Sequence, residues 1–450
     1  MKYLFTTAIR FFAICCMLVL VFVQQTAAQT STDSPYSQFG IGLLNPKTFN
    51  GNVGMSGLGY AWRPTNYKPG VYDSLARSNA QFNDRRTNYI NPKNPASYSN
   101  LSLTVFEAGL YGQSVQAQSG DQTQAYTNAQ LAHMAIAFPI GSKWGAGFGI
   151  RPFSKRGYEY SIPGRINGEE FDFNFNGSGG LNQIYASTAF EFSKHYSLGL
   201  TASYLFGTVI DERRVIYNDL TTDHFFNTVD QARNKVSDIT FDLGFQYTRA
   251  LGEDYHLVIG LVSSPIGELS AEQDRLVRTY EGSEGNESIK DTITNIQGNN
   301  QSVQLAPTLG GGFAIEKKGK WLIGVDYTNY NWNDLQVAQN IRLVNSQKFT
   351  LGYEKFNNLS AFGSYFKQMG IRAGAHYNSS LVQVNGEDVS EFGISFGISL
   401  PLRKTFSTLN AAIEVGQRGE NKNNLTQENY IGFQFGVTIN DRWFIKRKYD

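Results

Sequence analysis

Strict alternation of apolar and polar residues runs through several segments of the chain and predicts β-strands. In the clearest segment, Ile431, Phe433, Phe435, Val437 and Ile439 alternate with small or polar residues. Successive side chains of a strand point to opposite sides, so each such segment has one apolar face. Further apolar faces of this kind are Phe392, Ile394, Phe396, Ile398 and Leu400; Phe241, Leu243, Phe245 and Tyr247; Leu198, Leu200, Ala202, Tyr204 and Phe206; and Trp321, Ile323, Val325 and Tyr327.

The opposite faces of these strands carry glycine and small polar residues, with isolated charges among them. A soluble sandwich would favour Lys, Glu and Thr on a face in contact with water. A strand that faces lipid on one side alternates as observed here, so the pattern favours a transmembrane β-barrel. The glycine-rich second face suits a lumen packed against an internal plug.

The connections between strands alternate in length. We expect tight turns near Ser142-Lys143, Lys194-His195, Gly252-Glu253, Lys318-Gly319, Arg403-Lys404 and Asn440-Asp441. Longer polar stretches, expected as external loops, run from Ser154 to Gly180, Asp211 to Ser237, Pro265 to Ser302 and Asn331 to Lys348. Short periplasmic turns and long external loops are typical of outer-membrane barrels. Counting from Leu101 to Phe444 gives about 14 strands, an even number that puts both ends in the periplasm.

The chain begins with the pattern of a secretory signal. Lys2 and Arg10 precede an apolar run from Phe11 to Val23, and small residues follow up to Ala28. We therefore predict a signal peptide over residues 1–28, since the run is short for a membrane-spanning anchor. Its removal takes away both cysteines of the chain, so no disulfide or thiolate metal site is expected.

Residues 29–100 lack sustained alternation and are rich in Gly, Asn, Pro and Tyr. Irregular backbone cannot face lipid, because its polar groups would be unpaired. This segment therefore either plugs the lumen or stays in the periplasm. The predicted organisation is a signal peptide (1–28), a hatch or plug (29–100) and an all-β, antiparallel barrel (101–450).

Composition excludes some functions and leaves others open. The chain has 450 residues, a formal net charge of +1 and 17% charged residues, so no global field favours nucleic acid. Mean hydropathy is −0.32, which a barrel tolerates because only one face of each strand is apolar.

Short motifs resemble the FadL-like outer membrane proteins, which carry long-chain fatty acids and other hydrophobic compounds. Asn94, Pro95 and Ala96 match the Asn-Pro-Ala motif of that family's hatch, just before the first strand. The glycine-rich residues 51–59 resemble its hatch start, and residues 350–354 and 371–377 resemble two late strands. The segments 34–42 and 440–444 resemble a Bacteroidota branch. The resemblance implies a hatch that plugs a 14-stranded barrel, with the substrate left open.

Pro152 lies within the third expected strand, where proline cannot donate a ladder hydrogen bond. In the resembled family, a kink in this strand opens a lateral gap through which substrate leaves. Arg151, Pro152 and Phe153 are therefore a candidate lateral-gate kink. The alternative is that Pro152 simply ends the strand at the outer rim.

Charges on the inferred lumen faces form a second group of candidates: Asp242, Asp326, Glu354, Arg372 and Glu414. Unpaired buried charges are costly. We therefore predict that these charges form pairs that anchor the plug, rather than a polar conduit.

No motif predicts an enzyme, a cofactor or a metal site. Residues 393–397 match G-x-S-x-G, but that motif needs a strand-to-helix elbow and Ser395 lies within an alternating strand. The five histidines are scattered and show no ligand spacing. Three of them, His133, His256 and His376, fall on inferred lumen faces.

Two functions remain from the sequence. The first is passive transport of a hydrophobic small molecule, which predicts an apolar pocket between hatch and wall. The second is a structural or accessory subunit of an outer-membrane assembly or secretion complex, which predicts a sealed lumen and an exposed patch. The expected partners are outer-membrane lipids, the barrel-assembly machinery during insertion, and either a hydrophobic ligand or other outer-membrane proteins.

Overall fold

The computed structural model describes residues 34–63, 87–166, 169–217, 225–265, 267–283, 285–332, 335–338, 341–356, 365–380, 382–402, 405–422 and 425–441. The predicted signal peptide lies outside the described residues, as does part of the predicted hatch segment. Among the described residues, no helix is long and apolar enough to cross a membrane.

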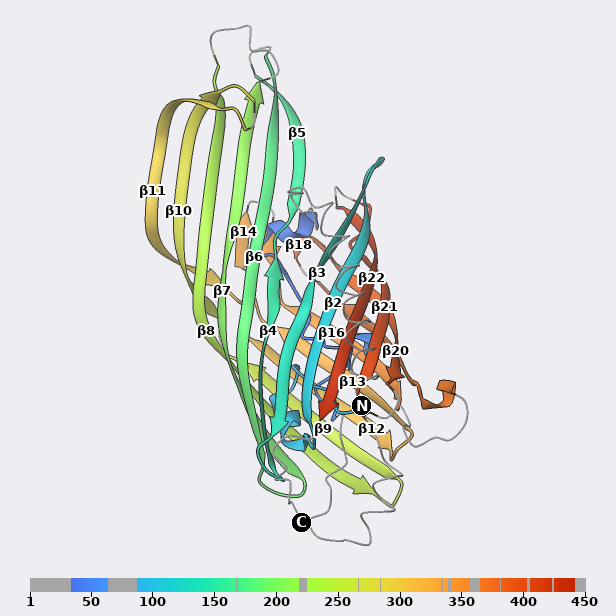
Figure 1. The fold of residues 1–450 in the computed structure, drawn as a ribbon. Helices are drawn as coiled ribbons and strands as arrows, with labels where there is room; N and C mark the ends of the chain where they lie inside the picture. Colours follow the sequence, from blue (N-terminus) through green and yellow to red (C-terminus); the bar gives the residue numbers. More distant parts are fainter. Residues whose placement is uncertain are drawn as a thin grey trace, which may run out of the picture. The chain divides into compact units, whose positions relative to one another are not determined.

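Within this part of the chain, 14 antiparallel strands close into a barrel, as the alternation predicted (Figure 1). They are β2 (Thr104–Ser119), β3 (Gln122–Pro139), β4 (Trp144–Lys155), β6 (Glu169–Glu191), β7 (Tyr196–Tyr217), β8 (Asn227–Leu251), β9 (Tyr255–Ser264), β12 (Thr308–Lys317), β13 (Trp321–Tyr330), β16 (Ser346–Lys355), β17 (Gly370–Asn378), β20 (Glu391–Pro401), β21 (Thr408–Arg418) and β22 (Gln427–Asp441). Each strand pairs with the next, and β2 pairs with β22 to close the barrel.

The two faces of the barrel strands differ as the sequence predicted. On β22, Phe433 and Phe435 are 43% and 60% exposed on the outside, whereas Gln434 between them is buried on the lumen side. The other apolar faces are exposed in the same way. An outward apolar band of this kind is what a lipid bilayer requires.

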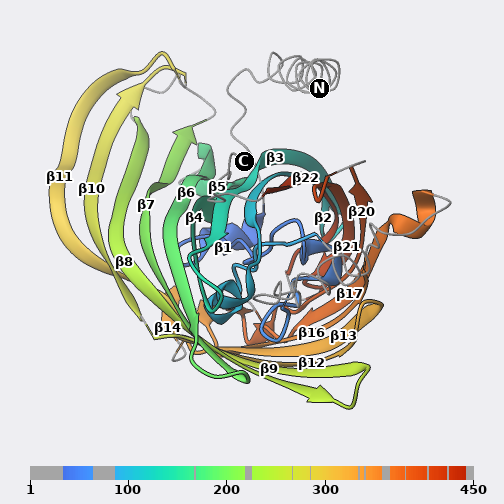
Figure 2. The same ribbon diagram turned by 60° about the horizontal axis from the view of Figure 1, so that its bottom comes forward.

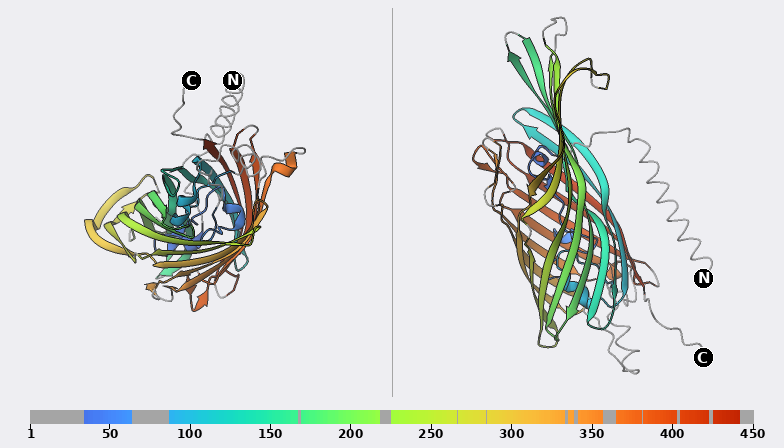
Figure 3. Two further views of the ribbon diagram at one scale, coloured as in Figure 1. Left: turned by 90° about the horizontal axis from the view of Figure 1, so that it is seen from below. Right: turned by 90° about the vertical axis from the view of Figure 1, so that its left-hand side faces the viewer.

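Three of the stretches expected as loops are strands instead. The external sheet consists of β5 (Tyr158–Ile166), β10 (Glu268–Glu281), β11 (Ser288–Gln304) and the outer parts of β6, β7 and β8, in the order β5-β6-β7-β8-β10-β11. It continues the barrel wall beyond the end of β4 (Figure 1; Figure 3, right). Strand β11 is mostly polar and exposed on both faces. The outer part of β6, in contrast, alternates Phe171, Phe173 and Phe175 with polar residues, a signal that the sequence analysis did not use.

The fourth stretch is partly folded too. It contains β14 (Leu335–Ala338) and β15 (Ile341–Leu343), which join β18 (Gln383–Val384) and β19 (Glu387–Asp388) in a small second sheet.

The predicted turns at Ser142-Lys143, Lys194-His195, Gly252-Glu253 and Lys318-Gly319 are short connections, as expected. Arg403-Lys404 lies outside the described residues. The turn expected at Asn440-Asp441 is wrong, because both residues belong to β22 and pair with Val105 and Thr104 of the first barrel strand. The barrel therefore begins and ends on the side of the short connections.

The described residues before β2 lie inside the barrel (Figure 2). They contain the 3-10 helices η1 (Pro35–Gln38), η2 (Val53–Met55) and η3 (Pro95–Asn100) and the short strand β1 (Leu43–Leu44); η4 (Tyr365–Gln368) lies later in the chain. Two clusters of buried apolar side chains join this segment to the wall, one around Phe49 and Tyr98 and one around Met55 and Trp62. We call residues 34–63 and 87–101 the hatch.

Candidate functional site

The Asn-Pro-Ala motif fixes the end of the hatch to the wall. Asn94 caps η3, since its Oδ1 accepts a hydrogen bond from the backbone N–H of Ala96 at 3.0 Å. Its Nδ2 donates to the carbonyl oxygen of Tyr60 at 2.7 Å and to that of Phe245 in β8 at 3.2 Å. One side chain thus caps a helix, joins two parts of the hatch and reaches a barrel strand.

Glycines of the wall leave the space in which the hatch backbone lies. A Cβ atom on Gly260 would stand 1.8 Å from the carbonyl oxygen of Tyr60, and one on Gly145 would stand 2.0 Å from that of Tyr98. Any larger residue at either position would overlap a backbone atom of the hatch. The glycine-rich lumen face is therefore the surface against which this segment packs.

Asn50 spans the seam where the barrel closes. Its Nδ2 donates to the carbonyl oxygens of Ala108 in β2 and Val437 in β22, at 3.2 and 3.0 Å. The hatch thus contacts both strands of the seam.

Two of the predicted lumen charges bind lysines of the hatch. Asp326 lies 2.9 Å from Lys93 Nζ and also accepts hydrogen bonds from the backbone N–H groups of Gly59 and Tyr60. Asp242 lies 2.7 Å from Lys47 Nζ. Both carboxylates have little contact with solvent, so each lysine compensates a charge that would be costly alone.

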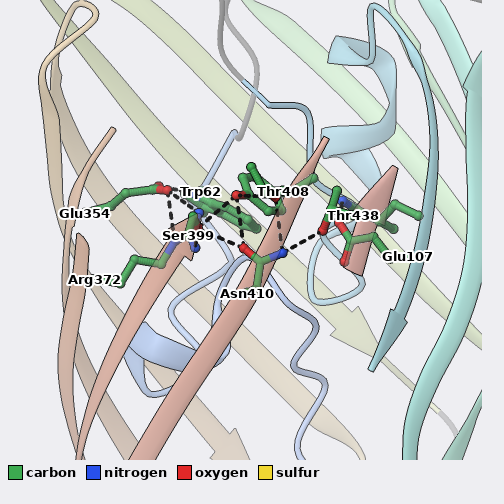
Figure 4. A network of polar contacts seen from close by, with 10 residues as sticks. Trp62, Glu107, Glu354, Arg372, Ser399, Thr408, Asn410 and Thr438 are labelled. Atoms are coloured by element: carbon green, nitrogen blue, oxygen red, sulfur yellow. Dashed lines mark hydrogen bonds and ion pairs between the residues drawn. The ribbon is translucent and has the colours of Figure 1, made fainter. Parts of the chain in front are cut away.

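Glu354 and Arg372 bind each other within the wall (Figure 4). Arg372 Nε and Nη2 donate to Glu354 Oε1 at 2.9 and 2.7 Å, and the guanidinium lies over the ring of Tyr89, 4.6 Å from its centre. Glu354 Oε2 accepts from the Trp62 indole N–H at 2.8 Å. Tyr89 and Trp62 belong to the hatch, so this buried pair holds two of its aromatic residues.

Glu414 is separate from these groups. Among the described residues, it accepts a hydrogen bond from the hydroxyl of Tyr430 on the neighbouring strand, at 3.3 Å, and forms no hydrogen bond or ion pair with the hatch. The five predicted charges thus form one direct pair, two hatch-bound carboxylates and a separate glutamate.

Ser395 of the G-x-S-x-G match and the lumen-face His133 both contact the hatch. Ser395 Oγ accepts a hydrogen bond from the backbone N–H of Ser56 in the hatch at 2.7 Å, and it lies within β20 rather than at an elbow. His133 stacks on Phe49 with ring centres 3.9 Å apart. The residues that the structure describes contain no cluster of three or more His, Cys, Asp and Glu able to hold a metal ion.

The wall changes at Arg151, Pro152 and Phe153. Strand β4 pairs with β3 only from Gly145 to Ile150, and then the two strands separate. On its other side β4 continues along β6, with a register shift between Pro152 and Ser154. Beyond Phe153, β3 no longer pairs with this edge of β4. Strand β1 of the hatch pairs with it instead, with Leu44 opposite Ser154.

A cavity of about 370 Å³ lies between the hatch and the outer half of the wall, and Arg151, Pro152 and Phe153 are among its lining residues. Its apolar lining includes Phe39, Leu43 and Leu305, whereas the lining from β16 to β22 is mostly polar. The cavity thus reaches the wall at the place where β3 and β4 part.

The sequence identified Glu414 and His376 of the cavity lining, but not Lys348, Glu391 and Arg418 beside them. It also did not identify the hatch residues Lys47, Lys93 and Asn50. The hatch residues lie in irregular chain, where no periodicity marks the inward side. The polar lining residues could have been predicted, because they lie on the lumen faces of strands that the alternation had already located.

The chain matches the family model described as BamG over residues 9–67 and 80–450. No curated protein matches the chain.

Solved structures with a similar fold include a hydrocarbon channel, a FadL homologue and a toluene transporter. The CymD monoaromatic hydrocarbon channel has a TM-score of 0.51 and 13% identity, over 89% of this chain and 98% of that one. A FadL homologue of Pseudomonas aeruginosa has a TM-score of 0.52 and 10% identity, over 89% and 99%. The toluene transporter TodX of Pseudomonas putida has a TM-score of 0.51 and 11% identity, over 90% and 100%.

At such identities these likenesses concern the fold. They confirm the resemblance to FadL-like barrels as one of architecture, and with the apolar outer band they identify an outer-membrane protein. The assignment to a Bacteroidota branch stays a prediction.

Proposed function

The chain belongs to the BamG family, and we propose that it forms a passive passage for hydrophobic small molecules, long-chain fatty acids or similar compounds, across the outer membrane. The observation that carries this proposal is the separation of β3 from β4 at Pro152, next to a cavity between hatch and wall. Cavities of a few hundred Å³ that hold small ligands are common in proteins.

The route runs from the cavity past Phe153 and sideways into the bilayer. Proline at 152 offers no N–H to the ladder, and β3 pairs with β4 only as far as Ile150. Strand β1 covers the resulting opening through its pairing with Ser154 and Lys155. This pairing is two residues long, and it is supported by hydrogen bonds from Asn45 N to the carbonyl oxygen of Phe153 and from Arg151 to the carbonyl oxygens of Asn45 and Pro46. Release of β1 breaks these contacts and opens the gap.

A disulfide between β1 and β4 tests this route. In the double variant Leu44→Cys, Ser154→Cys the two residues face each other in an antiparallel pair, a geometry that suits a disulfide. We expect the oxidised protein to take up a radiolabelled C16 fatty acid about tenfold more slowly or worse, because β1 can no longer leave. A reductant restores uptake.

Each single cysteine variant is the control, and neither should respond to oxidant. Unchanged uptake by the fully oxidised double variant would reject lateral passage at this site.

The external sheet favours a second function, as a structural or accessory subunit of an outer-membrane complex. Strand β11 forms its edge and pairs only with β10 among the described strands. It is 17 residues long, and from Thr292 to Gln304 it contains no charge and no proline. Natural edge strands are usually short or charged, because an open edge pairs readily with another strand.

Deleting residues 268–304, which form the β10–β11 hairpin, tests this second function. Leu305 and Gly267 are already joined by a backbone hydrogen bond, so a short turn can replace the hairpin. We expect the barrel to assemble normally, while a partner that co-purifies stoichiometrically with the wild-type protein in mild detergent is lost. A protein that purifies alone from native membranes in both forms would count against the subunit function.

A further inference from the structure

The register of five barrel strands gathers polar side chains on one side of the cavity. Residues that pair across neighbouring strands form rows around the lumen. The outermost of these rows consists of Lys348 (β16), Asn378 (β17), Glu391 (β20), Arg418 (β21) and Glu428 (β22). The next lumen row contains His376 and Tyr430, separated by two glycines, and Glu414 lies one row deeper. We call Lys348, His376, Glu391, Glu414, Arg418 and Tyr430 the polar bowl; all six line the cavity.

Arg418, Glu391 and Glu428 are bound to one another by ion pairs and together carry a net charge of −1. Arg418 donates to Glu391 at 2.9 Å and to Glu428 at 3.0 Å. Glu428 also accepts hydrogen bonds from the hydroxyls of Ser34 and Tyr126. This arginine and its two carboxylates therefore hold one another and the start of the hatch, and they have little capacity left for a ligand.

Lys348 and Glu414 take no part in these ion pairs. Lys348 forms no ion pair or hydrogen bond with any residue that the structure describes, and Glu414 has the Tyr430 hydroxyl as its described partner. Their charges are close enough to act on each other, but the two groups are not within the 4.0 Å of an ion pair. Among the described residues of the polar bowl, Lys348 and Glu414 are thus the two charged side chains without an ion pair, and they lie at different depths.

Buried groups without partners lie between and beside them. His376 is 7% exposed and Gln434 is 4% exposed. His376 Nδ1 and Gln434 Nε2 are enclosed but have no hydrogen-bond partner among the described residues, and both side chains line the cavity. An enclosed polar atom without a partner costs about 1–3 kcal/mol. Such atoms are compensated when a polar ligand, or water, occupies the space.

The rest of the cavity suits an apolar chain. Phe39 and Leu43 of the hatch and Leu305 of the wall line it, and Phe153 and Leu305 pack against the same buried cluster. A molecule with a charged head at the polar bowl can thus place its tail along these residues toward the gap between β3 and β4.

We propose that this cavity binds a zwitterionic amphiphile, with the anionic part of its head group at Lys348 and its ammonium at Glu414. This inference rests on the passage proposed above and names the class of molecule that enters it. An uncharged hydrocarbon would leave the lysine, the glutamate and the histidine without partners. A simple anion would satisfy Lys348 but would add a negative charge beside Glu391 and Glu414.

Binding of four probes to the full-length protein in maltoside detergent, followed by native mass spectrometry, tests the proposal. The probes are lysophosphatidylethanolamine, lysophosphatidylglycerol, dodecylamine and glycerophosphoethanolamine, which has the same head group without the tail. We expect the zwitterionic lysolipid to bind tightest. Lys348→Met should weaken both lysophospholipids, whereas Glu414→Gln should weaken only the zwitterionic one, each by about tenfold or more.

Lys422→Met and Glu420→Gln, at an exposed ion pair, are the matched controls and should bind like wild type. Lys348 has no ion pair with any described residue, and Glu414 accepts one long hydrogen bond from Tyr430, which a glutamine oxygen can also accept. Both test variants should therefore keep the heat-dependent electrophoretic shift of a folded barrel. Equal binding of both lysophospholipids, or no effect of Glu414→Gln, would overturn the proposal and leave a water-filled cavity. If the head group without its tail binds as well as the lysolipid, the ligand is a soluble zwitterion and the amphiphile is rejected.

The disulfide between β1 and β4 separates this inference from the passage. Binding that persists in the locked protein while uptake stops supports both. If binding to the polar bowl is absent but uptake still depends on the lock, the passage stands and the assigned ligand class fails. If binding is specific but the lock leaves uptake unchanged, the site stands and the lateral passage fails.

Discussion

Replacing Arg372 with Met is expected to lower the free energy of unfolding by about 3–5 kcal/mol, as when one partner of a buried ion pair is lost. The guanidinium makes two hydrogen bonds to Glu354 and one, of 2.6 Å, to Ser399. Without it, Glu354 remains almost fully buried and keeps only the Trp62 indole N–H. Unfolding by guanidinium chloride in detergent, followed by tryptophan fluorescence, measures the loss.

The double variant Arg372→Met, Glu354→Met should recover most of this stability and come within about 1 kcal/mol of wild type, because replacing a buried pair by apolar residues is often neutral. Arg165→Met is the control, since Arg165 and Glu170 form an exposed pair about two-thirds accessible to solvent. A double variant as unstable as Arg372→Met would mean that the hydrogen bonds to Ser399 and Trp62, rather than the ion pair, dominate.

The variant Gly260→Val should detach the hatch from the wall. Its Cβ would lie 1.8 Å from the carbonyl oxygen of Tyr60, and a backbone atom cannot rotate away as a side chain can. We expect a loss of about 3 kcal/mol, the upper end for overpacking, and a hatch that protease cleaves in the folded barrel. Unfolding midpoints and limited proteolysis measure the two effects.

Gly311→Ala provides the matched control in the adjacent strand. Its Cβ would lie 3.2 Å from the end of the Leu261 side chain, which can move. This variant should keep wild-type stability and an uncleaved hatch. Equal behaviour of the two glycine variants would contradict close packing of residues 34–63 in the lumen.

The sequence predicted the barrel because its evidence is local. A strand that faces lipid must place an apolar side chain at every second position, and Phe433 and Phe435 show this without knowledge of any neighbour. The glycines on the lumen face likewise indicated close packing before any partner was known. The count of 14 strands followed from these faces and from the short turns.

The edge strand of the external sheet could not be predicted from the same signal. Strand β11 has water on both faces, so nothing selects apolar residues at alternate positions, and most of its side chains are exposed. These segments become strands because they continue the hydrogen-bonded ladders of β6, β7 and β8 beyond the membrane, which is a property of the sheet.

The candidate site was predicted in part. The carboxylates of Asp242 and Asp326 stood out because charges are rare on a barrel wall, but their partners Lys47 and Lys93 lie in irregular chain far away in sequence. Pro152 was a candidate because it interrupts an otherwise regular strand pattern. That β1 covers the opening depends on a two-residue contact between segments more than a hundred positions apart.

By itself, the sequence determined which side of each strand faces lipid, roughly how many strands close the barrel, and that irregular chain precedes it. These follow from the solvent on the two faces and from the need to pair every backbone polar group in a membrane. Only the tertiary structure decided which charges are paired. Register places Arg418 beside Glu391 and Glu428, and it leaves Lys348 and Glu414 outside any ion pair among the residues that the structure describes. Pairing depends on the distance between strands that the chain brings together only after folding.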